Sequence, residues 1–296
     1  MKEWWKNLSK RAKLFIYLGV FVAICVGAFL IPHGKKETFD AANEFILSPI
    51  IKIPKIGPVD LSISKAVLYL WAAVIIICIV SLYINRRLIH SKKAKPSRFQ
   101  VTLEGLYDLT HNQIANSVMK VGADVWFPYI AGSFTFILIL NFLGLIPLPV
   151  GEGGQLAFYA PTGNLYVAVA FGLSTFVLTH YAGIRAKGGI KYVKGWAVKE
   201  APPVMKQFIF ATHVLSEFFR LISLSVRLFA NLLAGHMLLA VLFAMALLFQ
   251  SYFFAGVFSV GSAVIYLFEV FVAAIQAFIF AILSAAYIGG ALEEGH

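Results

Sequence analysis

The sequence predicts an all-α integral membrane protein with about six membrane-embedded helices and one amphipathic interfacial helix. Apolar residues form 60% of the 296-residue chain and charged residues only 13%, whereas a soluble domain is usually nearer half apolar and a quarter charged. The apolar residues gather in runs of about 20 or more, the length that a helix needs to cross a bilayer. Mean hydropathy is +0.82, so we expect lipid rather than water around most of the chain.

The net charge of +11 does not indicate a nucleic-acid partner, because the basic residues form no basic face. Eighteen of the 25 Lys and Arg lie in three blocks, at residues 2–13, 86–120 and 185–206. Each block abuts an apolar run, which is typical of cytoplasmic loops. The sequence also has no zinc-ligand spacing and no phosphate-binding glycine loop, so we expect no cofactor and no catalytic site of its own.

The first apolar segment, residues 14–31, follows a basic start. A signal peptide and an uncleaved helix both fit this pattern, and the weak cleavage site favours the helix, with the N-terminus inside. Residues 33–61 are mixed and polar and contain a Pro/Gly cluster that marks a break. We therefore expect residues 1–61 to form an extra N-terminal helix and loop, followed by the main domain at residues 62–296.

Three further spans are predicted at about residues 66–85, 126–148 and 164–184. Residues 97–122 are too polar to span, and the spacing of their apolar positions favours an amphipathic helix at the interface. The loop at 147–163 has no Lys or Arg and is expected outside. The basic blocks then place both chain termini on the cytoplasmic side.

The last two apolar runs are too long for simple spans. Residues 204–250 and 256–291 would be ~70 Å and ~54 Å long as single helices, against ~30 Å of hydrocarbon. Either each run breaks into two pieces, near Gly235 and Gly261, or both form long helices that lie strongly tilted.

Two arginines lie within the first of these runs, where a charge is expensive. An arginine at a helix centre costs ~2.5–3.5 kcal/mol on insertion scales and is a functional hypothesis by default. Arg220 has Glu217 three residues before it as a local partner. Arg227 has no acid within two turns, and its neighbours at one turn, Ser223 and Asn231, cannot neutralise it. One interpretation is that the Arg227 side chain extends to the lipid headgroups. The small residues on the same face favour another: a helix of another chain packs closely there and supplies a carboxylate.

Two more ionisable residues lie in the same apolar runs. His236 follows Arg227 by nine residues and faces the opposite side of the helix. Glu269 and Gln276 are seven residues apart and share a face. A buried glutamate without a nearby Lys or Arg is either neutral or paired, and His236 is its natural partner. Spacing alone leaves open whether that pair is a structural contact or a proton relay.

Three segments of the chain resemble the signature sequences of subunit a of F-type ATP synthases. They are residues 223–236 (SLSVRLFANLLAGH), 276–287 (QAFIFAILSAAY) and 141–147 (NFLGLIP). With the order of the spans, the resemblance covers about residues 62–294. It implies that the two long runs form a tilted hairpin, about residues 203–291, against a ring of c subunits.

The resemblance also implies roles for single residues. Arg227 would be the essential arginine that faces the c-ring, with Asn231 and Gln276 as the polar residues beside it. His236 and Glu269 would be a carboxylate–imidazole pair on the access half-channel. The supporting polar residues would be Ser223, Glu217, Arg220, Asn141 and Asn164.

Some positions depart from the family pattern. In residues 161–166 (PTGNLY), Asn164 replaces an acid and Tyr166 replaces an asparagine, and Gly144 stands where some members carry aspartate. The changes at Asn164 and Gly144 remove acids attributed to the channel entrance, so an entrance role is not carried over to these positions. The segment 14–31 lies outside the resemblance.

The function implied is that of a stator subunit with two offset half-channels that couple proton or sodium translocation to rotation. The implied partners are the c-ring, the subunit b peripheral stalk, the remainder of the F-type ATP synthase and the lipid bilayer of, most simply, a bacterial inner membrane. Two alternatives remain open at this point: a secondary transporter or channel in which Arg227 binds an anionic substrate, and a purely structural scaffold.

Overall fold

The computed structural model describes residues 49–51, 62–90, 98–146, 160–196, 202–248 and 252–293. The expected first helix at 14–31 lies outside the described residues, as do most of the loop at 33–61 and residues 147–159. The described residues fall into two compact units. Residues 238–248 and 252–267 belong to one, and the other described residues belong to the second.

Five helices of the described part are long and apolar enough to cross a membrane, and the predicted all-α membrane fold is confirmed. The first of them is α3 (Lys65–His90), which ends in the second basic block. A short antiparallel pairing of β1 (Pro49–Ile51) with β2 (Ile63–Ser64) precedes it. Little of the apolar part of α3 is buried, which fits a surface that faces lipid or other chains.

The expected amphipathic helix is present but has three parts, α4 (Arg98–Asp108), the π-helix η2 (Leu109–Ala115) and α5 (Asn116–Val118). Its apolar side includes Ile114, which is fully buried in the core that it shares with α6. This helix therefore packs on protein as well as offering a polar face outward. The π-helical turn was not predicted, because apolar spacing does not distinguish it from an α-helix.

The next segment contains α6 (Ala123–Leu145), the 3-10 turn η4 (Pro161–Gly163), α7 (Leu165–Lys187) and a short helix, α8 (Gly189–Gly195). α6 and α7 correspond to the third and fourth predicted spans. α8 was not predicted, since seven residues carry too little periodicity to indicate a helix. It follows α7 directly through Gly188, whose φ of 82° is in the left-handed region that glycine adopts at little cost.

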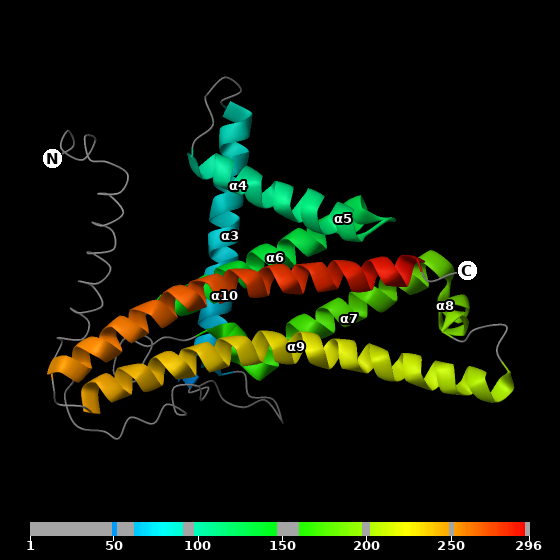
Figure 1. The fold of residues 1–296 in the computed structure, drawn as a ribbon. Coiled ribbons are helices and arrows are strands. Elements are labelled where there is room, and N and C mark those ends of the chain that lie inside the picture. The colour runs from blue at the N-terminus through cyan, green and yellow to red at the C-terminus, as the bar shows by residue number, and fades with distance from the viewer. Residues whose placement is uncertain are drawn as a thin grey trace. The chain divides into compact units, whose positions relative to one another are not determined.

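Both long runs are single helices, α9 (Pro203–Leu248) and α10 (Tyr252–Glu293). The alternative of breaks near Gly235 and Gly261 is therefore wrong. A glycine inside an apolar helix is tolerated where packing compensates for its low propensity. Within the second unit, the stretch of α9 up to Met237 and the stretch of α10 from Phe268 lie side by side (Figure 1).

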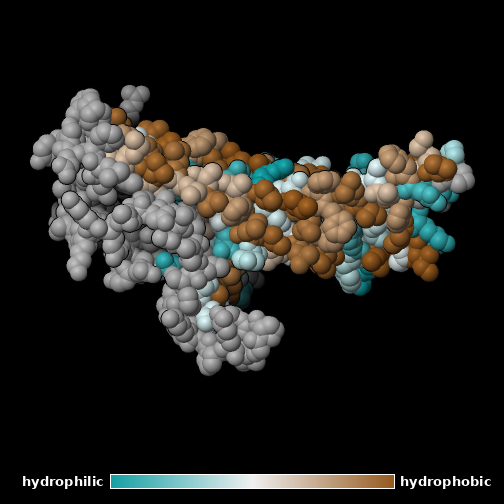
Figure 2. All heavy atoms as spheres, turned by 90° about the horizontal axis from the view of Figure 1, so that it is seen from below, coloured by the Kyte–Doolittle hydropathy of each residue, from teal (hydrophilic) through white to brown (hydrophobic). Residues whose placement is uncertain are grey.

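One core joins these helices. Its buried residues come from η2, α6, α7, α9 and α10, and alanines from α7 and α10 supply much of it. Small side chains let helix backbones approach closely, which stabilises helix packing inside a membrane. The outer surface is apolar over much of the face seen in Figure 2, with hydrophilic side chains in separate patches.

Candidate functional site

Arg227 lies on the exposed side of α9, with Ser223 and Asn231 one turn away on the same side. The adjoining side of this stretch is held in the core by Leu224 and Leu228. Among the described residues, no carboxylate lies within ion-pair distance of the Arg227 guanidinium. A permanent positive charge is thus presented outward from a helix that the core fixes in rotation.

The polar residues beside this arginine connect the two long helices. The side-chain amide of Asn231 donates a hydrogen bond of 2.6 Å to Oε1 of Gln276. Gln276 is fully buried, so its amide is held in place by packing as well as by the bond. The arginine-bearing turn of α9 is therefore joined directly to α10.

His236 and Glu269 are both buried, at 3% and 6% exposure. Neither ring nitrogen of His236 and neither carboxyl oxygen of Glu269 has a hydrogen-bond partner among the described residues. The hydrogen bond expected between them is thus not formed in this structure. The Glu269 carboxyl group instead lies against the backbone of Gly235, the residue before His236. Buried polar groups without partners are rare and point to function rather than to packing.

A second buried carboxylate lies earlier on α9. The expected local pair is present: Arg220 donates to Glu217 at 2.6 Å. The same carboxyl oxygen lies 3.6 Å from Nε2 of His213, and the Arg220 guanidinium stacks over the ring of Tyr287 on α10, 5.3 Å from its centre. Arg220 is therefore neutralised within its own chain, whereas Arg227 has no such partner among the residues that the structure describes.

A small cavity adjoins this carboxylate. It is lined by Glu217 and Arg220 of α9, by Tyr287 of α10, and by Thr175 and Thr179 of α7. The Thr179 hydroxyl is buried and has no hydrogen-bond partner among the described residues. The surface of the cavity is mainly apolar, since Phe176, Leu221 and Leu224 also line it, and the polar side chains lie at its edges.

A chain of hydroxyl groups extends from this cavity. Thr175 is 2.7 Å from the phenol oxygen of Tyr129 on α6 and 3.2 Å from the Ser284 hydroxyl on α10. Sequence reasoning missed these residues. The signal available was the pair of threonines, Thr175 and Thr179, four residues apart and so on one face of an apolar helix.

The short helix α8 packs on the C-terminal end of α7. Tyr192 of α8 hydrogen-bonds Nδ1 of His180 at 2.9 Å, and Trp196, just after α8, packs on the His213 ring with centres 4.9 Å apart. The aromatic rings therefore connect the short helix to α7 and to the His213–Glu217 contact on α9.

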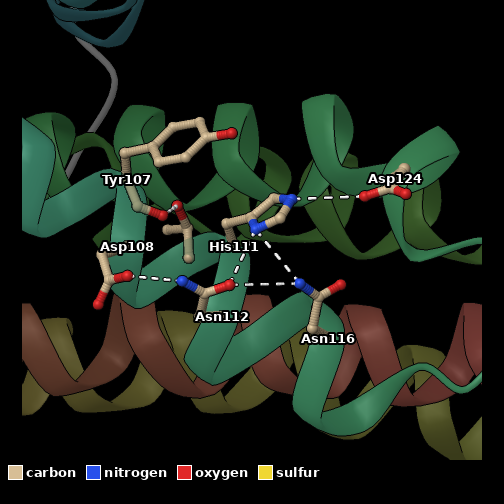
Figure 3. Close-up of polar contacts among 7 residues, drawn as sticks. Tyr107, Asp108, His111, Asn112, Asn116 and Asp124 are labelled. Atoms are coloured by element: carbon tan, nitrogen blue, oxygen red, sulfur yellow. Dashed lines mark hydrogen bonds and ion pairs between the residues drawn. The ribbon is translucent and has the colours of Figure 1, made fainter.

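A further polar cluster lies where the π-helix meets α6 (Figure 3). Nε2 of His111 is 3.4 Å from the Asp124 carboxylate. Its Nδ1 is 3.1 Å from Oδ1 of Asn112 and 3.2 Å from Nδ2 of Asn116, and the ring stacks on Tyr107. The wider π-helical turn brings these polar residues together on one side, and no spacing in the sequence indicated the cluster.

The other positions singled out in the sequence make contacts that cap a helix or pack helices together. Asn164 caps the start of α7, accepting a hydrogen bond from the Tyr166 amide at 2.9 Å. Tyr166 itself is exposed. Asn141 is fully buried and bonds both α10 and the η4 turn. Gly144 is buried against Ala160, where a Cβ would come within 2.6 Å of that backbone, so an aspartate has no room there.

These features define a class: a helical integral membrane protein whose two longest helices carry buried carboxyl groups and an arginine that has no ion-pair partner within the described part of the chain. The chain belongs to the ATP synthase A chain family, whose family model matches residues 67–289. The resemblance of the three signature segments is thereby confirmed. The match does not include residues 14–31.

Curated relatives agree with the family. The chain is 35% identical over 270 residues to "ATP synthase subunit a" of Rubrobacter xylanophilus, covering 89% of this chain and 96% of that protein. It is 32% identical over 265 residues to the protein of that name from Chlorobium phaeobacteroides strain BS1 (87% and 73% covered). The protein of that name from Pelodictyon phaeoclathratiforme is 33% identical over 279 residues (89% and 79% covered).

The close approach of Glu269 to Gly235 gives a stability prediction. Gly235→Ala places a methyl group where the Glu269 carboxyl group lies, and we expect it to lower the free energy of unfolding by about 1–3 kcal/mol, as overpacking does. Thermal unfolding of the purified chain in detergent measures this change.

Gly261→Ala is the matched control, because nothing lies within 4 Å of the added Cβ. Without a clash, an alanine stabilises a helix by about 0.5–1 kcal/mol relative to glycine. Equal effects of the two substitutions would contradict the packing described for Glu269.

Proposed function

We propose that this chain is the stator subunit a of a rotary ATP synthase, in which Arg227 separates two offset half-channels that lead ions to and from a c-ring. The observation that carries the proposal is an exposed arginine on α9 between two buried carboxyl groups, with no counter-charge among the described residues. Family membership supports the complex to which the chain is assigned.

The spacing along α9 supports two separate routes. Glu217 precedes Arg227 by ten residues, or about 15 Å along the helix axis, and the Gly235–His236 turn follows it by eight or nine, or about 12–13 Å. Glu269 of α10 lies beside this Gly235–His236 turn. One ionisable group thus stands on each side of the arginine, and neither is close enough to neutralise it.

The orientation follows from the basic blocks, which favour cytoplasmic termini. On this orientation the Glu217 cavity belongs to the inner half-channel, and His236 with Glu269 belongs to the outer one. The hydroxyl groups of Thr179 and Thr175 supply polar lining to the inner route. Groups that can both donate and accept hydrogen bonds are suited to a water-assisted proton path.

The charge of Arg227 explains how the two routes are coupled. A ring carboxyl group that passes through lipid is neutral, because burying a charge is expensive. At ~4 Å from a guanidinium its ionised form gains ~4 kcal/mol at an effective dielectric of 20, a factor of about a thousand. The group therefore releases its ion beside Arg227 and must reload before it returns to lipid. Each charge that crosses yields ~2.3 kcal/mol per 100 mV.

The remaining assignments follow from this role. The chain supplies no catalytic site, and it contacts the c-ring, the subunit b stalk and the rest of the complex in a bacterial inner membrane. Selectivity for proton or sodium resides in the ring's carboxyl site. On this proposal, residues 62–296 are the subunit a domain.

Neutralising the arginine tests the proposal. Arg227→Ala in the assembled complex, reconstituted into vesicles, is expected to abolish ATP-driven ion pumping measured by a pH-sensitive dye. Arg227→Lys should not restore the full rate, since a desolvated lysine can lose its proton.

Arg185→Ala is the control, because it removes another exposed arginine, in the last turn of α7, and should pump normally. Wild-type pumping by Arg227→Ala would end the proposal. Transport of an anion by the purified chain alone, lost with the same substitution, would favour the transporter alternative instead.

The inner route gives a second prediction. Glu217→Gln and Thr179→Val remove an ionisable group and an unpartnered hydroxyl from the cavity without a large change in volume. Each is expected to slow pumping by about tenfold, which corresponds to about 1.4 kcal/mol on the barrier. Glu104→Gln, on the exposed side of α4, is the control and should pump normally. Unchanged rates in both cavity variants would exclude the cavity from the inner route.

A further inference from the structure

One buried side chain ties three elements together at the level of the functional residues of α10. The Asn141 amide of α6 donates a hydrogen bond of 3.0 Å to the backbone carbonyl of Ala273 in α10. Its carbonyl oxygen accepts a bond of 2.7 Å from the Thr162 hydroxyl in η4. Both side chains are fully buried, at 0% exposure. Thr162 therefore holds the amide in the one orientation that donates to α10.

The place of this contact on α10 is informative. Ala273 lies four residues after Glu269 and three before Gln276, so both functional residues are within about 6 Å of it along the helix axis. A bond from a side chain to a helix carbonyl fixes translation as well as rotation of that helix. The position of α10 thus determines whether Gln276 meets Asn231 at 2.6 Å and where Glu269 stands against Gly235.

The turn that holds Asn141 is itself fixed on two sides. Ala160 packs on Gly144 of α6, with no room for a Cβ. Gly163 lies in van der Waals contact range of the α9 backbone at Leu233, two residues after Asn231. The η4 turn therefore stands between α6 and α9, and through Asn141 it reaches α10.

We propose that Asn141 and Thr162 are positioning residues that set the register of α10, and so align Glu269 and Gln276 with the arginine-bearing turn of α9. The described core between the helices is mostly alanine, leucine and isoleucine, whose contacts are not directional. The bond from Asn141 adds α6 and η4 to the polar contacts that Gln276, Ser284 and Tyr287 of α10 make with α9 and α7, and a one-turn shift of about 5.4 Å would break it. The effect on transport rests on the function proposed above. The role of these two residues in setting the register of α10 is independent of that function.

A disulfide pair can report the register. Met119 and a Cβ built at Gly289 of α10 are 3.8 Å apart between Cβ atoms, the mean separation in disulfides. Met119→Cys with Gly289→Cys should therefore cross-link in the native register, in a full chain with Cys25 and Cys78 replaced by serine. Met119→Cys with Ala286→Cys, or with Leu292→Cys, reports a shift of about one turn in either direction.

The experiment measures the ratio of native to shifted cross-links in the assembled complex. Asn141→Leu is expected to lower this ratio about tenfold, the effect of losing a buried hydrogen bond of typical strength. Thr162→Val should lower it in the same direction, and Thr162→Ser, which keeps the hydroxyl, should restore it. The same variants should alter the pH profile of pumping, because Glu269 is moved to a different environment.

Ser133→Ala is the matched control, because among the described residues this buried α6 hydroxyl bonds to its own helix alone, at Ile130. It should leave both the cross-link ratio and the pH profile unchanged. A native ratio in assembled Asn141→Leu and Thr162→Val complexes would overturn the proposal, as would an equal loss in the Ser133→Ala control. Because cross-linking needs no transport, this result is separable from failure of the function proposed for Arg227.

Discussion

The structure depends on a permanent charge that this chain does not neutralise among its described residues. Arg227 stands on the outward side of α9, and the acid that could have paired with it on the same helix, Glu217, is already bonded to Arg220 and lies ten residues away. A guanidinium keeps its charge at any accessible pH, and an isolated charge in hydrocarbon is expensive. On the function proposed above, the counter-charge of this residue is the carboxylate of a passing ring subunit.

The other contacts of the described fold fix the position of the α9 turn that carries Arg227. The buried leucines of α9 fix its rotation, and the Asn231–Gln276 bond joins it to α10. Gly235 gives the Glu269 side chain its place against the helix backbone, and Asn141 with Thr162 bonds α10 from the other side. The contacts of Asn231, Gln276, Asn141 and Thr162 use polar groups where apolar ones would have packed, which is a cost that a purely structural membrane bundle does not need to bear.

Much of this could be predicted from the sequence, since hydropathy and basic blocks indicate membrane helices directly. The spans within the described residues followed from these patterns, the Glu217–Arg220 pair from its three-residue spacing, and the family from the three signature segments. Contacts between distant segments did not. The expected bond between His236 and Glu269 is not formed, because one-helix geometry says nothing about how deep a neighbouring helix lies. Asn141 and Gly144 appeared only as family positions, and their physical roles depend on where Ala273 and Ala160 come to rest. The π-helical cluster at His111 gave no signal at all, because its wider turn changes which residues share a face.

The central claim concerns what lies opposite Arg227, and a density map of the whole complex from its native membrane tests it most directly. The account predicts a carboxylate of a different polypeptide within about 4 Å of the guanidinium, the separation at which such a pair is effective. An arginine that points to lipid headgroups, or one that is paired with an acid of its own chain, would contradict it.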